Sequence, residues 1–418
     1  MEHTDRHRQP RHTLVVVNFA VALFSLIAFY VLSPPFRRTL QRTFIRAILL
    51  LAAWVPLPFS LDKPSDLAVA IRSFSDYTSS QQAALHHKHL AYARMPRVHR
   101  AIGAKLRWKE TLERAEDAVE LNSRVTDALA GLGREQARRD GSPYGLRSKL
   151  HTEQGRVVET LKHFVRDWSA EGKSERDALF PPILDALTGE YSEREGKKVL
   201  VPGCGLGRLA YEIALLGFSV DANDYSHFMN LGSTLIFSPL HTSEPSQHAA
   251  APYVHSFSHQ RTAADLVRTV RFPDVVPDPA VVQRLAFMPG DFVELFPGEA
   301  THDAVVTLFF IDTARNLLAY FSTIHRALRP GGVWLNAGPL LYHGGGPAMQ
   351  LPLEDVVRAA ELVGFVVERR EALREVRYTA DEKGMYTFAY DCDFWVARKP
   401  RTAGAGARAG KTAQGRGE

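Results

Sequence analysis

The sequence predicts an α/β protein in which a mostly parallel sheet carries helices on both faces and follows an N-terminal helical region. From residue 197 onward, short apolar runs such as KVLVP (198–202) alternate with amphipathic stretches such as LAYEIALLG (209–217). This alternation is typical of βα units and a parallel sheet. From about 75 to 190, apolar residues recur at three-to-four-residue spacing with many i,i+4 charge pairs, which indicates helices.

Composition excludes several classes of protein. The 418 residues are 45% hydrophobic and 23% charged, which is usual for globular proteins and not for disordered, collagen-like or disulfide-stapled chains. Cys204 and Cys392 have no companion Cys or His at metal-ligand spacing, so the sequence predicts no metal site and a reducing compartment.

The charge distribution disfavours nucleic-acid binding. Residues 1–46 hold seven arginines against two acids and residues 400–418 hold four basic residues against one acid, so the net charge of +5 leaves −3 for 47–399. Nucleic-acid binders concentrate cations on the folded body. We therefore expect small-molecule chemistry and no nucleic-acid partner.

The N-terminal 60 residues contain a candidate membrane anchor. Residues 13–33 are uncharged and long enough to span a bilayer as a helix. Four arginines follow this run and three precede it, which favours a catalytic domain facing the cytoplasm. Alternatively, residues 13–33 are a targeting segment or a buried helix. The protein would then be soluble and cytoplasmic or nuclear.

The rest of the chain divides into three parts. A helical region spans 75–190, and its HHKH cluster (86–89) is interpreted as a solvated helix face because adjacent helical histidines point in different directions. The α/β domain spans 191–400 and is interrupted by an insertion at 238–285 that is rich in Pro, His and Ser. A Gly-, Ala- and Arg-rich tail at 401–418 is predicted to be disordered.

A glycine-rich turn is the strongest local motif. In VLVPGCGLGRLAYEIALLG (199–217), Gly203, Gly205 and Gly207 connect a strand-like run to a helix. Glycines permit a tight turn and the close approach of a ligand, and a helix N-terminus offers unpaired N–H groups. Arg208 replaces the third glycine of a dinucleotide fingerprint, and the G-x-G-x-G spacing is typical of S-adenosylmethionine loops. A purely structural turn is the alternative.

Three carboxylates follow predicted strands. Asp224 lies 21 residues after Gly203, where nucleotide-binding α/β folds place an acid that accepts ribose hydroxyls, and Asp221 is its competitor for that role. Asp291 and Phe292 are predicted to contact an adenine ring, and a helix N-cap by Asp291 is compatible with this. Asp312 ends the run DAVVTLFFID and is expected at the ligand-binding edge, with a loop cap as the alternative.

Several long strings resemble the carnosine N-methyltransferase family, a group of class I S-adenosylmethionine-dependent methyltransferases. They include VPGCGLGRLAYEIALLGF, NDYSHFMNLGS, VVTLFFIDTARN, GGVWLNAGPLLYH and FWVARKP, and the resemblance runs from about 75 to 400. The resemblance implies a Rossmann-like seven-stranded sheet. It also implies S-adenosylmethionine as the cofactor.

Site residues follow from the resemblance by position. Arg166 matches an arginine that reaches the cofactor carboxylate, and His163 stands where the family usually has Gln. Gly203, Asp224, Asp291 and Phe292 match cofactor positions, with Asp224 in place of a more usual Glu. The implied substrate-binding residues are Asp312, His343, Tyr378 and Tyr390. The structural alternatives are that His343 is an exposed loop histidine and that the two tyrosines only pack in the core.

The function implied is N-methylation of the imidazole of carnosine, giving anserine, or of a related histidine-containing dipeptide. Asp312 is predicted to be catalytic, because accepting one imidazole N–H leaves the other nitrogen free to attack. Methylation of histidine within a protein or peptide and a non-catalytic membrane-attached protein are the alternatives. A nicotinamide dehydrogenase is disfavoured by Arg208.

Overall fold

The computed structural model describes residues 66–141, 151–298, 300–342 and 349–401. The predicted anchor at 13–33 and the tail beyond 401 lie outside these ranges. Within them, no helix is both long and apolar enough to cross a bilayer. The transmembrane helix expected at 13–33 stays a prediction.

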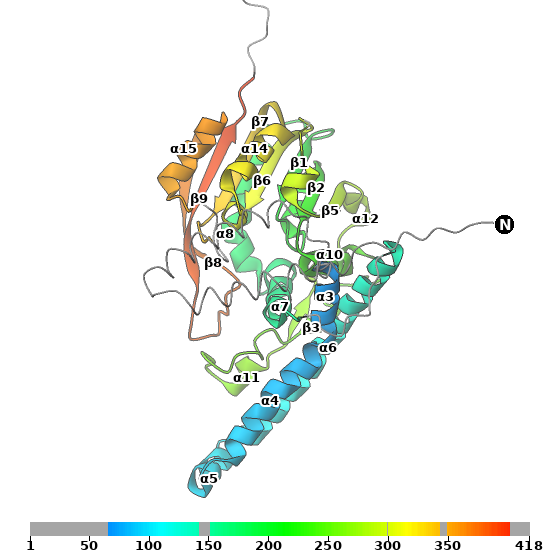
Figure 1. The fold of residues 1–418 in the computed structure, drawn as a ribbon, viewed down its shortest axis with the longest axis vertical. Helices are drawn as coiled ribbons and strands as arrows, with labels where there is room; N and C mark the ends of the chain where they lie inside the picture. The colour runs from blue at the N-terminus through cyan, green and yellow to red at the C-terminus, as the bar shows by residue number, and fades with distance from the viewer. Residues whose placement is uncertain (1–65, 142–150, 299, 343–348, 402–418) are drawn as a thin grey trace, which may run out of the picture. The chain divides into compact units, whose positions relative to one another are not determined.

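The described strands form a mostly parallel sheet of seven strands in the order β5-β2-β1-β6-β7-β9-β8, together with a separate pair, β3-β4 (Figure 1). Neighbours from β5 to β7 run parallel, whereas β9 is antiparallel to both β7 and β8. This confirms the predicted Rossmann-like class I methyltransferase sheet. The strands are β1 (Lys198–Pro202), β2 (Ser219–Asp224), β3 (His248–Ala250), β4 (Val270–Phe272), β5 (Leu285–Pro289), β6 (His302–Leu308), β7 (Leu328–Gly338), β8 (Val366–Arg377) and β9 (Ala389–Arg398).

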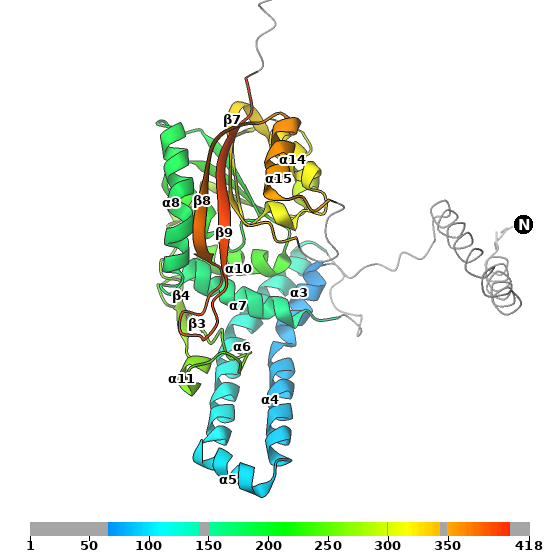
Figure 2. The same ribbon diagram turned by 90° about the vertical axis from the view of Figure 1, so that its left-hand side faces the viewer.

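Helices cover both faces of this sheet (Figure 2). The apolar faces of α8 (Lys173–Glu190) and α9 (Arg208–Leu215) share one core with β1, β2 and β6. On the opposite face, the second core contains α13 (Phe292–Leu295), α14 (Leu317–Ala327) and α15 (Leu353–Val363). The central strands are near-continuous apolar runs because neither face meets water, whereas the edge strand β8 is mostly exposed and charged.

The helical region builds a third core below the sheet. Its long helix α6 packs against α3, α4 and α10, and buried side chains from all four helices share one cluster. The remaining helices are α3 (Asp66–Ser75), α4 (Tyr77–Ala93), α5 (Arg97–Lys105), α6 (Trp108–Arg139), α7 (Gln154–Trp168), α10 (His227–Phe237), α11 (Ala263–Leu266) and α12 (Pro279–Val282), with a 3-10 turn η1 (Ile311–Thr313).

The segment 238–285 carries β3, β4 and two short helices and is joined to the helical region by a buried polar contact. The amide of Asn122, on α6, donates from Nδ2 to the carbonyl of Ala251 (3.0 Å) and accepts at Oδ1 from the Ala251 N–H (2.7 Å). Asn122 is fully buried, so this reciprocal pair satisfies a side chain that would otherwise be costly to bury. The helical region and the segment are thereby fixed on each other.

Candidate active site

The glycine turn forms the floor of the candidate site. It follows β1 directly, and Gly203, Gly205 and Gly207 all have positive φ angles, at 67°, 57° and 81°. A Cβ atom on Gly203 would lie 2.4 Å from Cδ2 of Phe310. Glycine is therefore required there both by the backbone conformation and by the close approach of an aromatic ring.

Arg208, at the position where a dinucleotide loop has glycine, is structural. It begins α9, and its Nη1 donates to the carbonyl of Asp167 (3.0 Å) and to Oδ1 of Asp274 (2.7 Å). Asp274 also accepts from Nη2 of Arg176 at 2.6 Å. The arginine thus joins the glycine turn to α7 and to the segment 238–285.

Asp224 lies at the end of β2, beside the glycine turn. Its Oδ2 accepts from the N–H of Gly205 and its Oδ1 accepts from the N–H of Ser226, both at 2.8 Å. Burial raises the pKa of Asp224, and the two backbone hydrogen bonds only partly offset this effect. The carboxylate is held in one orientation and lines the cavity.

Asp221, the competing acid, is engaged elsewhere. Its Oδ2 lies 2.9 Å from Nε2 of His302 and 2.8 Å from Nζ of Lys198. Burial alone would raise the pKa of Asp221, but these two partners outweigh burial and hold the pKa below its usual value. The side chain is absent from the cavity lining, so the structure assigns it to packing between β1, β2 and β6.

Asp291 and Phe292 lie where α13 begins. Oδ1 of Asp291 caps the helix by accepting from the N–H groups of Val293 (2.8 Å) and Glu294 (3.3 Å). Phe292 is buried, and its ring meets those of Phe310 and Tyr320 edge-to-face, each with centroids 5.4 Å apart. Asp291 therefore has the predicted capping role, and Phe292 belongs to an aromatic wall.

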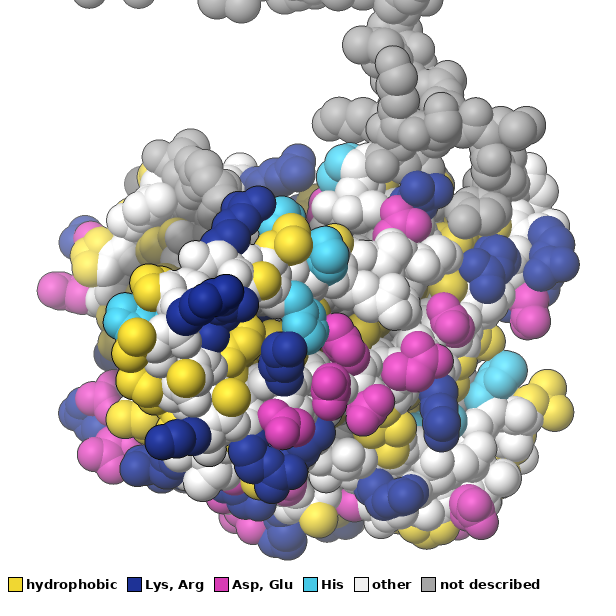
Figure 3. Space-filling view, turned by 90° about the horizontal axis from the view of Figure 1, so that it is seen from below, with side chains coloured by type: hydrophobic (Ala, Val, Ile, Leu, Met, Phe, Trp, Pro, Cys, Tyr) yellow, Lys and Arg dark blue, Asp and Glu magenta, His cyan; other side chains and the backbone are white. Residues whose placement is uncertain are grey.

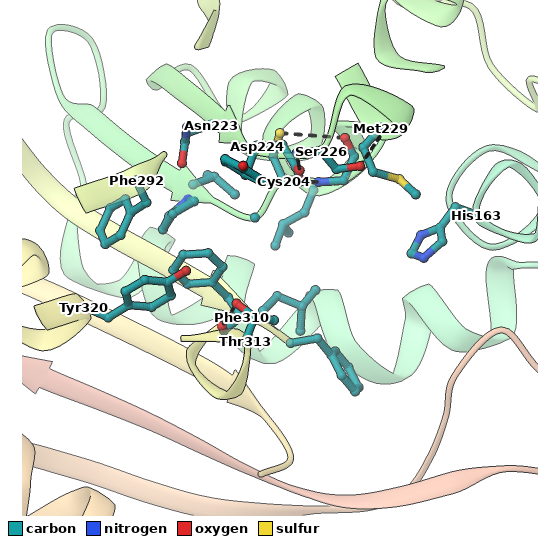
Figure 4. A pocket seen from close by; sticks show the side chains of 18 of the residues that line it. His163, Cys204, Asn223, Asp224, Ser226, Met229, Phe292, Phe310, Thr313 and Tyr320 are labelled. Carbon is teal, nitrogen blue, oxygen red and sulfur yellow. Dashed lines mark hydrogen bonds between the residues drawn. The ribbon is translucent and has the colours of Figure 1, made fainter. Parts of the chain in front are cut away.

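The cavity has a volume of about 660 Å³ and lies at the carboxyl ends of β1, β2 and β6. Figure 4 shows His163 across this cavity from Phe292 and Tyr320. Its lining combines predicted cofactor residues and the predicted substrate residue Tyr378 with residues that sequence reasoning missed. The predicted group is His163, Arg166, Gly203, Gly205, Asp224, Asp291, Phe292 and Tyr378, and the missed group includes Met229, Phe309, Phe310, Thr313, Arg315 and Tyr320.

A charged cluster on α7 forms the opposite wall. Nε of Arg166 lies 3.7 Å from Oδ1 of Asp167 and 3.9 Å from Oε2 of Glu175, and its guanidinium lies 4.8 Å from the ring centroid of Tyr378. Burial alone would lower the pKa of Arg166. The pKa is nevertheless held above its ordinary value by Asp167, Tyr378 and Glu175. The wall therefore presents a permanent cation to the cavity.

His163 lies beside this cation, one helical turn before Asp167. Its Nε2 is 3.4 Å from the hydroxyl of Tyr378, at the limit of a hydrogen bond, and its Nδ1 is 3.9 Å from Oδ2 of Asp167. Nδ1 is buried and has no hydrogen-bond partner among the described residues. A buried polar atom without a partner next to a cavity is suited to a ligand group.

The predicted substrate residues gather beyond the end of β6. Tyr378 follows β8 directly, Tyr390 lies in β9, and their ring centroids are 6.3 Å apart. Phe309 packs on both rings, at 4.8 Å from Tyr378 and 5.8 Å from Tyr390. Its left-handed backbone (φ 52°) is uncommon for an aromatic residue and marks the strained junction between β6 and η1.

Asp312 lies in η1, between the cavity-lining residues Phe310 and Thr313. The carboxyl group is buried, and its Oδ2 accepts from the N–H of Leu341 at 2.8 Å. Burial raises the pKa of Tyr390, and the charge of Asp312 raises it further. The structure thus brings Asp312, Tyr378 and Tyr390 to one region, and His343 lies outside the described residues.

Two other chemistries find little support. Burial raises the pKa of the Cys204 thiol well above its usual value, which disfavours the thiolate form at this cavity residue. Across the described ranges, no three His, Cys, Asp or Glu side chains are grouped to hold a metal ion. In the HHKH cluster (86–89), Nε2 of His89 lies 3.1 Å from Oε1 of Glu116 on α6, so this histidine contacts the neighbouring helix.

Comparison with known proteins identifies the family. The family model described as Carnosine N-methyltransferase matches residues 146–401. The Schizosaccharomyces pombe carnosine N-methyltransferase is 33% identical over 309 residues, which are 69% of this chain and 82% of that protein. The chain belongs to the carnosine N-methyltransferase family.

Animal members of the carnosine N-methyltransferase family match a shorter region. The rat (Rattus norvegicus) protein is 38% identical over 255 residues, and the Drosophila melanogaster protein is 38% identical over 250 residues. These matches cover 59% and 58% of this chain and 63% and 54% of those proteins. The chain therefore spans less than two thirds of the length of these two relatives.

The aromatic wall was missed for a physical reason. The sequence places Phe309 and Phe310 in the apolar run DAVVTLFFID, and no local pattern distinguishes Tyr320. Phe310 and Tyr320 stack with centroids 4.7 Å apart because η1 and α14 fold back over the end of β6. The paired phenylalanines before Asp312 were the available signal, since an open α/β sheet binds ligands beyond its carboxyl ends.

Proposed function

We propose that the chain is an S-adenosylmethionine-dependent N-methyltransferase that methylates the imidazole of carnosine or of a closely related histidine-containing dipeptide. Membership of the carnosine N-methyltransferase family supports the reaction class. The single observation that carries the proposal is one cavity whose lining joins the Asp224 and glycine-turn floor to the Arg166 wall and includes Phe310 and Thr313, which flank the buried Asp312 in the chain.

The cavity residues fit the cofactor. Positive φ at Gly203 and Gly205 lets the backbone approach a ligand, and each Asp224 oxygen that accepts one backbone N–H retains acceptor capacity for ribose hydroxyls. The guanidinium of Arg166 and the unpartnered Nδ1 of His163 suit the cofactor's carboxylate.

The adenine end has its own candidate residues. Asp291 uses only Oδ1 for its helix cap within the described contacts, which leaves Oδ2 to accept from the adenine amine. Phe292, Phe310 and Tyr320 supply apolar surface against a flat ring. When bound, S-adenosylmethionine supplies a methyl group that is already electrophilic, so the protein's task is to position the acceptor.

Asp312 would then prepare that acceptor. Its carboxylate accepts the N–H of one imidazole nitrogen, which fixes the tautomer and leaves a lone pair on the other nitrogen to form the new N–C bond. The same carboxylate balances the imidazolium charge and takes up its N–H proton. The hydrogen bond from Leu341 N–H orients the carboxyl group, and Tyr378 and Tyr390 bind the rest of the dipeptide.

The experiment is methyl transfer from labelled S-adenosylmethionine by the full chain to carnosine, free histidine and a histidine-containing protein fragment. We expect kcat/KM to be highest for carnosine. Preference for the protein fragment would replace the dipeptide with a macromolecular substrate. Cofactor binding without transfer to any of the three would refute the proposed acceptor class.

A further inference from the structure

The short helix α5 crosses the end of the hairpin formed by α4 and α6, and one of its faces is fixed to that hairpin. The hydroxyl of Tyr92, on α4, donates to the carbonyl of Arg100 at 2.7 Å. A Cβ atom on Gly103 would lie 2.5 Å from the Tyr92 ring, so the helix backbone rests directly on this tyrosine. Its orientation is therefore set by packing and a hydrogen bond.

The outward face of α5 is apolar. Val98, Ile102 and Leu106 succeed one another at four-residue spacing and are 71%, 53% and 73% exposed, and Met95 just before the helix is 45% exposed. Residues at this spacing share one face of a helix. None of the nine residues of α5 is buried. The fold thus holds a row of aliphatic side chains in water at the end of a long hairpin.

Basic residues alternate with this row in the sequence, and one of them, Arg107, has its Nε 3.9 Å from Oε1 of Glu110. No Asp or Glu occurs between Asp76 and Glu110 in the sequence. Figure 3 views the molecule from this end and shows hydrophobic side chains gathered with Lys and Arg. We call the surface of residues 94–107 the hairpin tip, and its basic residues are Arg94, Arg97, Arg100, Lys105 and Arg107.

We propose that the hairpin tip binds the surface of a bilayer that contains anionic phospholipid. An amphipathic helix with aliphatic residues on one side and Lys or Arg beside them inserts its apolar face at the boundary between headgroups and acyl chains. The flanking cations meet the negative surface potential of the lipid headgroups. This partner matches both features of the tip at once.

Other partners match only one feature. A nucleic acid would pair with the arginines and leave the aliphatic row in water. A second copy of the chain in a two-fold contact would cover the row but would set the same cations against one another. Self-association would differ from lipid binding because it needs no vesicles and grows with protein concentration.

The test uses the full chain with an environment-sensitive fluorophore on Ala101→Cys, an exposed position of α5 that leaves the aliphatic row intact. The matched control is Glu135→Cys, exposed on the far part of α6. The unsubstituted chain, treated with the same reagent, gives the background from Cys204 and Cys392. Because the probe reports only its own surroundings, it separates the tip from the apolar sequence at 13–33.

We expect a blue shift of the Ala101→Cys probe on vesicles of phosphatidylcholine with phosphatidylserine, little shift on phosphatidylcholine alone, and none at Glu135→Cys. Adding Val98→Glu and Leu106→Glu should reduce the shift by about tenfold, with thermal unfolding showing that the chain remains folded. A probe that stays in water while the chain sediments with vesicles would overturn the proposal. So would a shift that needs no vesicles and grows with protein concentration, which would indicate self-association.

Discussion

The N–H of Gly205 donates to Oδ2 of Asp224 at 2.8 Å, so the turn after β1 and the acid that ends β2 are one structural unit. Ser226 N–H holds the second oxygen at the same distance. The acid therefore keeps a single orientation toward the cavity, and a change in the glycine turn is transmitted to the residue proposed to bind ribose.

The first prediction concerns Gly203. Gly203→Ala places a Cβ in a left-handed conformation and against Phe310, so we expect the free energy of unfolding to fall by at least about 1 kcal/mol and cofactor affinity to fall with it. Gly131→Ala on α6 has open space around it and should stabilise the chain by about 0.5–1 kcal/mol. Urea unfolding and calorimetric titration measure the two effects. Equal behaviour of the two variants would contradict this assignment.

The second prediction concerns the pH dependence of cofactor binding. Burial raises the pKa of Asp224, so this carboxylate takes up a proton at a higher pH than an ordinary aspartate. The protonated acid is a poorer acceptor, and affinity for S-adenosylmethionine should fall as pH decreases through the raised pKa. Asp224→Asn should bind weakly and lose this dependence, whereas Asp221→Asn should keep it. A pH profile that is the same for the unsubstituted chain and Asp224→Asn would exclude Asp224 as its source.

Local sequence was sufficient for part of the site. The glycine turn and Asp224 follow strands that are readable as apolar runs, and the carboxyl ends of parallel neighbours must share one edge. The contacts that complete the cavity depend on folding over long distances. Tyr378 reaches Arg166 only because the antiparallel β8 and β9 return along the sheet, and no local pattern encodes that approach.

Helical periodicity likewise predicted that the region before the sheet is helical. It did not predict how these helices pack. The pattern from 75 to 190 indicates helices, yet it does not distinguish an outward apolar face from a buried one. Val98 and Ile102 have the spacing of core residues and remain exposed because Tyr92 occupies the other side of α5. The transmembrane interpretation of 13–33 stays a prediction, since those residues lie outside the described ranges.

The third prediction is a loss of stability on acidification. Burial lowers the pKa of His255 to about 4, and Nε2 of this histidine is 2.7 Å from the hydroxyl of Tyr77. The unfolded chain binds the proton near pH 6.5, so the free energy of unfolding should fall as pH drops from 6.5 to 4, by about 3 kcal/mol. Urea unfolding across this range measures it. His255→Gln should flatten the profile, and an unaltered slope in that variant would assign the effect to other groups.

The fourth prediction separates chemistry from binding. Asp312→Asn keeps the size of the buried side chain and can still accept from Leu341 N–H, so cofactor affinity should be unchanged. Turnover should fall by roughly 100-fold or more, because the amide cannot take up the imidazole proton. Steady-state kinetics with titrated cofactor measures both. Unchanged turnover would remove Asp312 from the proposed mechanism.

The most direct test of the proposed function is to locate the new methyl group in the product that the full chain forms from S-adenosylmethionine and carnosine. Nuclear magnetic resonance of the purified product distinguishes an imidazole N-methyl group from one on the terminal amine. We predict a methyl group on one imidazole nitrogen. Methylation of the amine, or no methylated carnosine from a chain that binds the cofactor, would contradict the account.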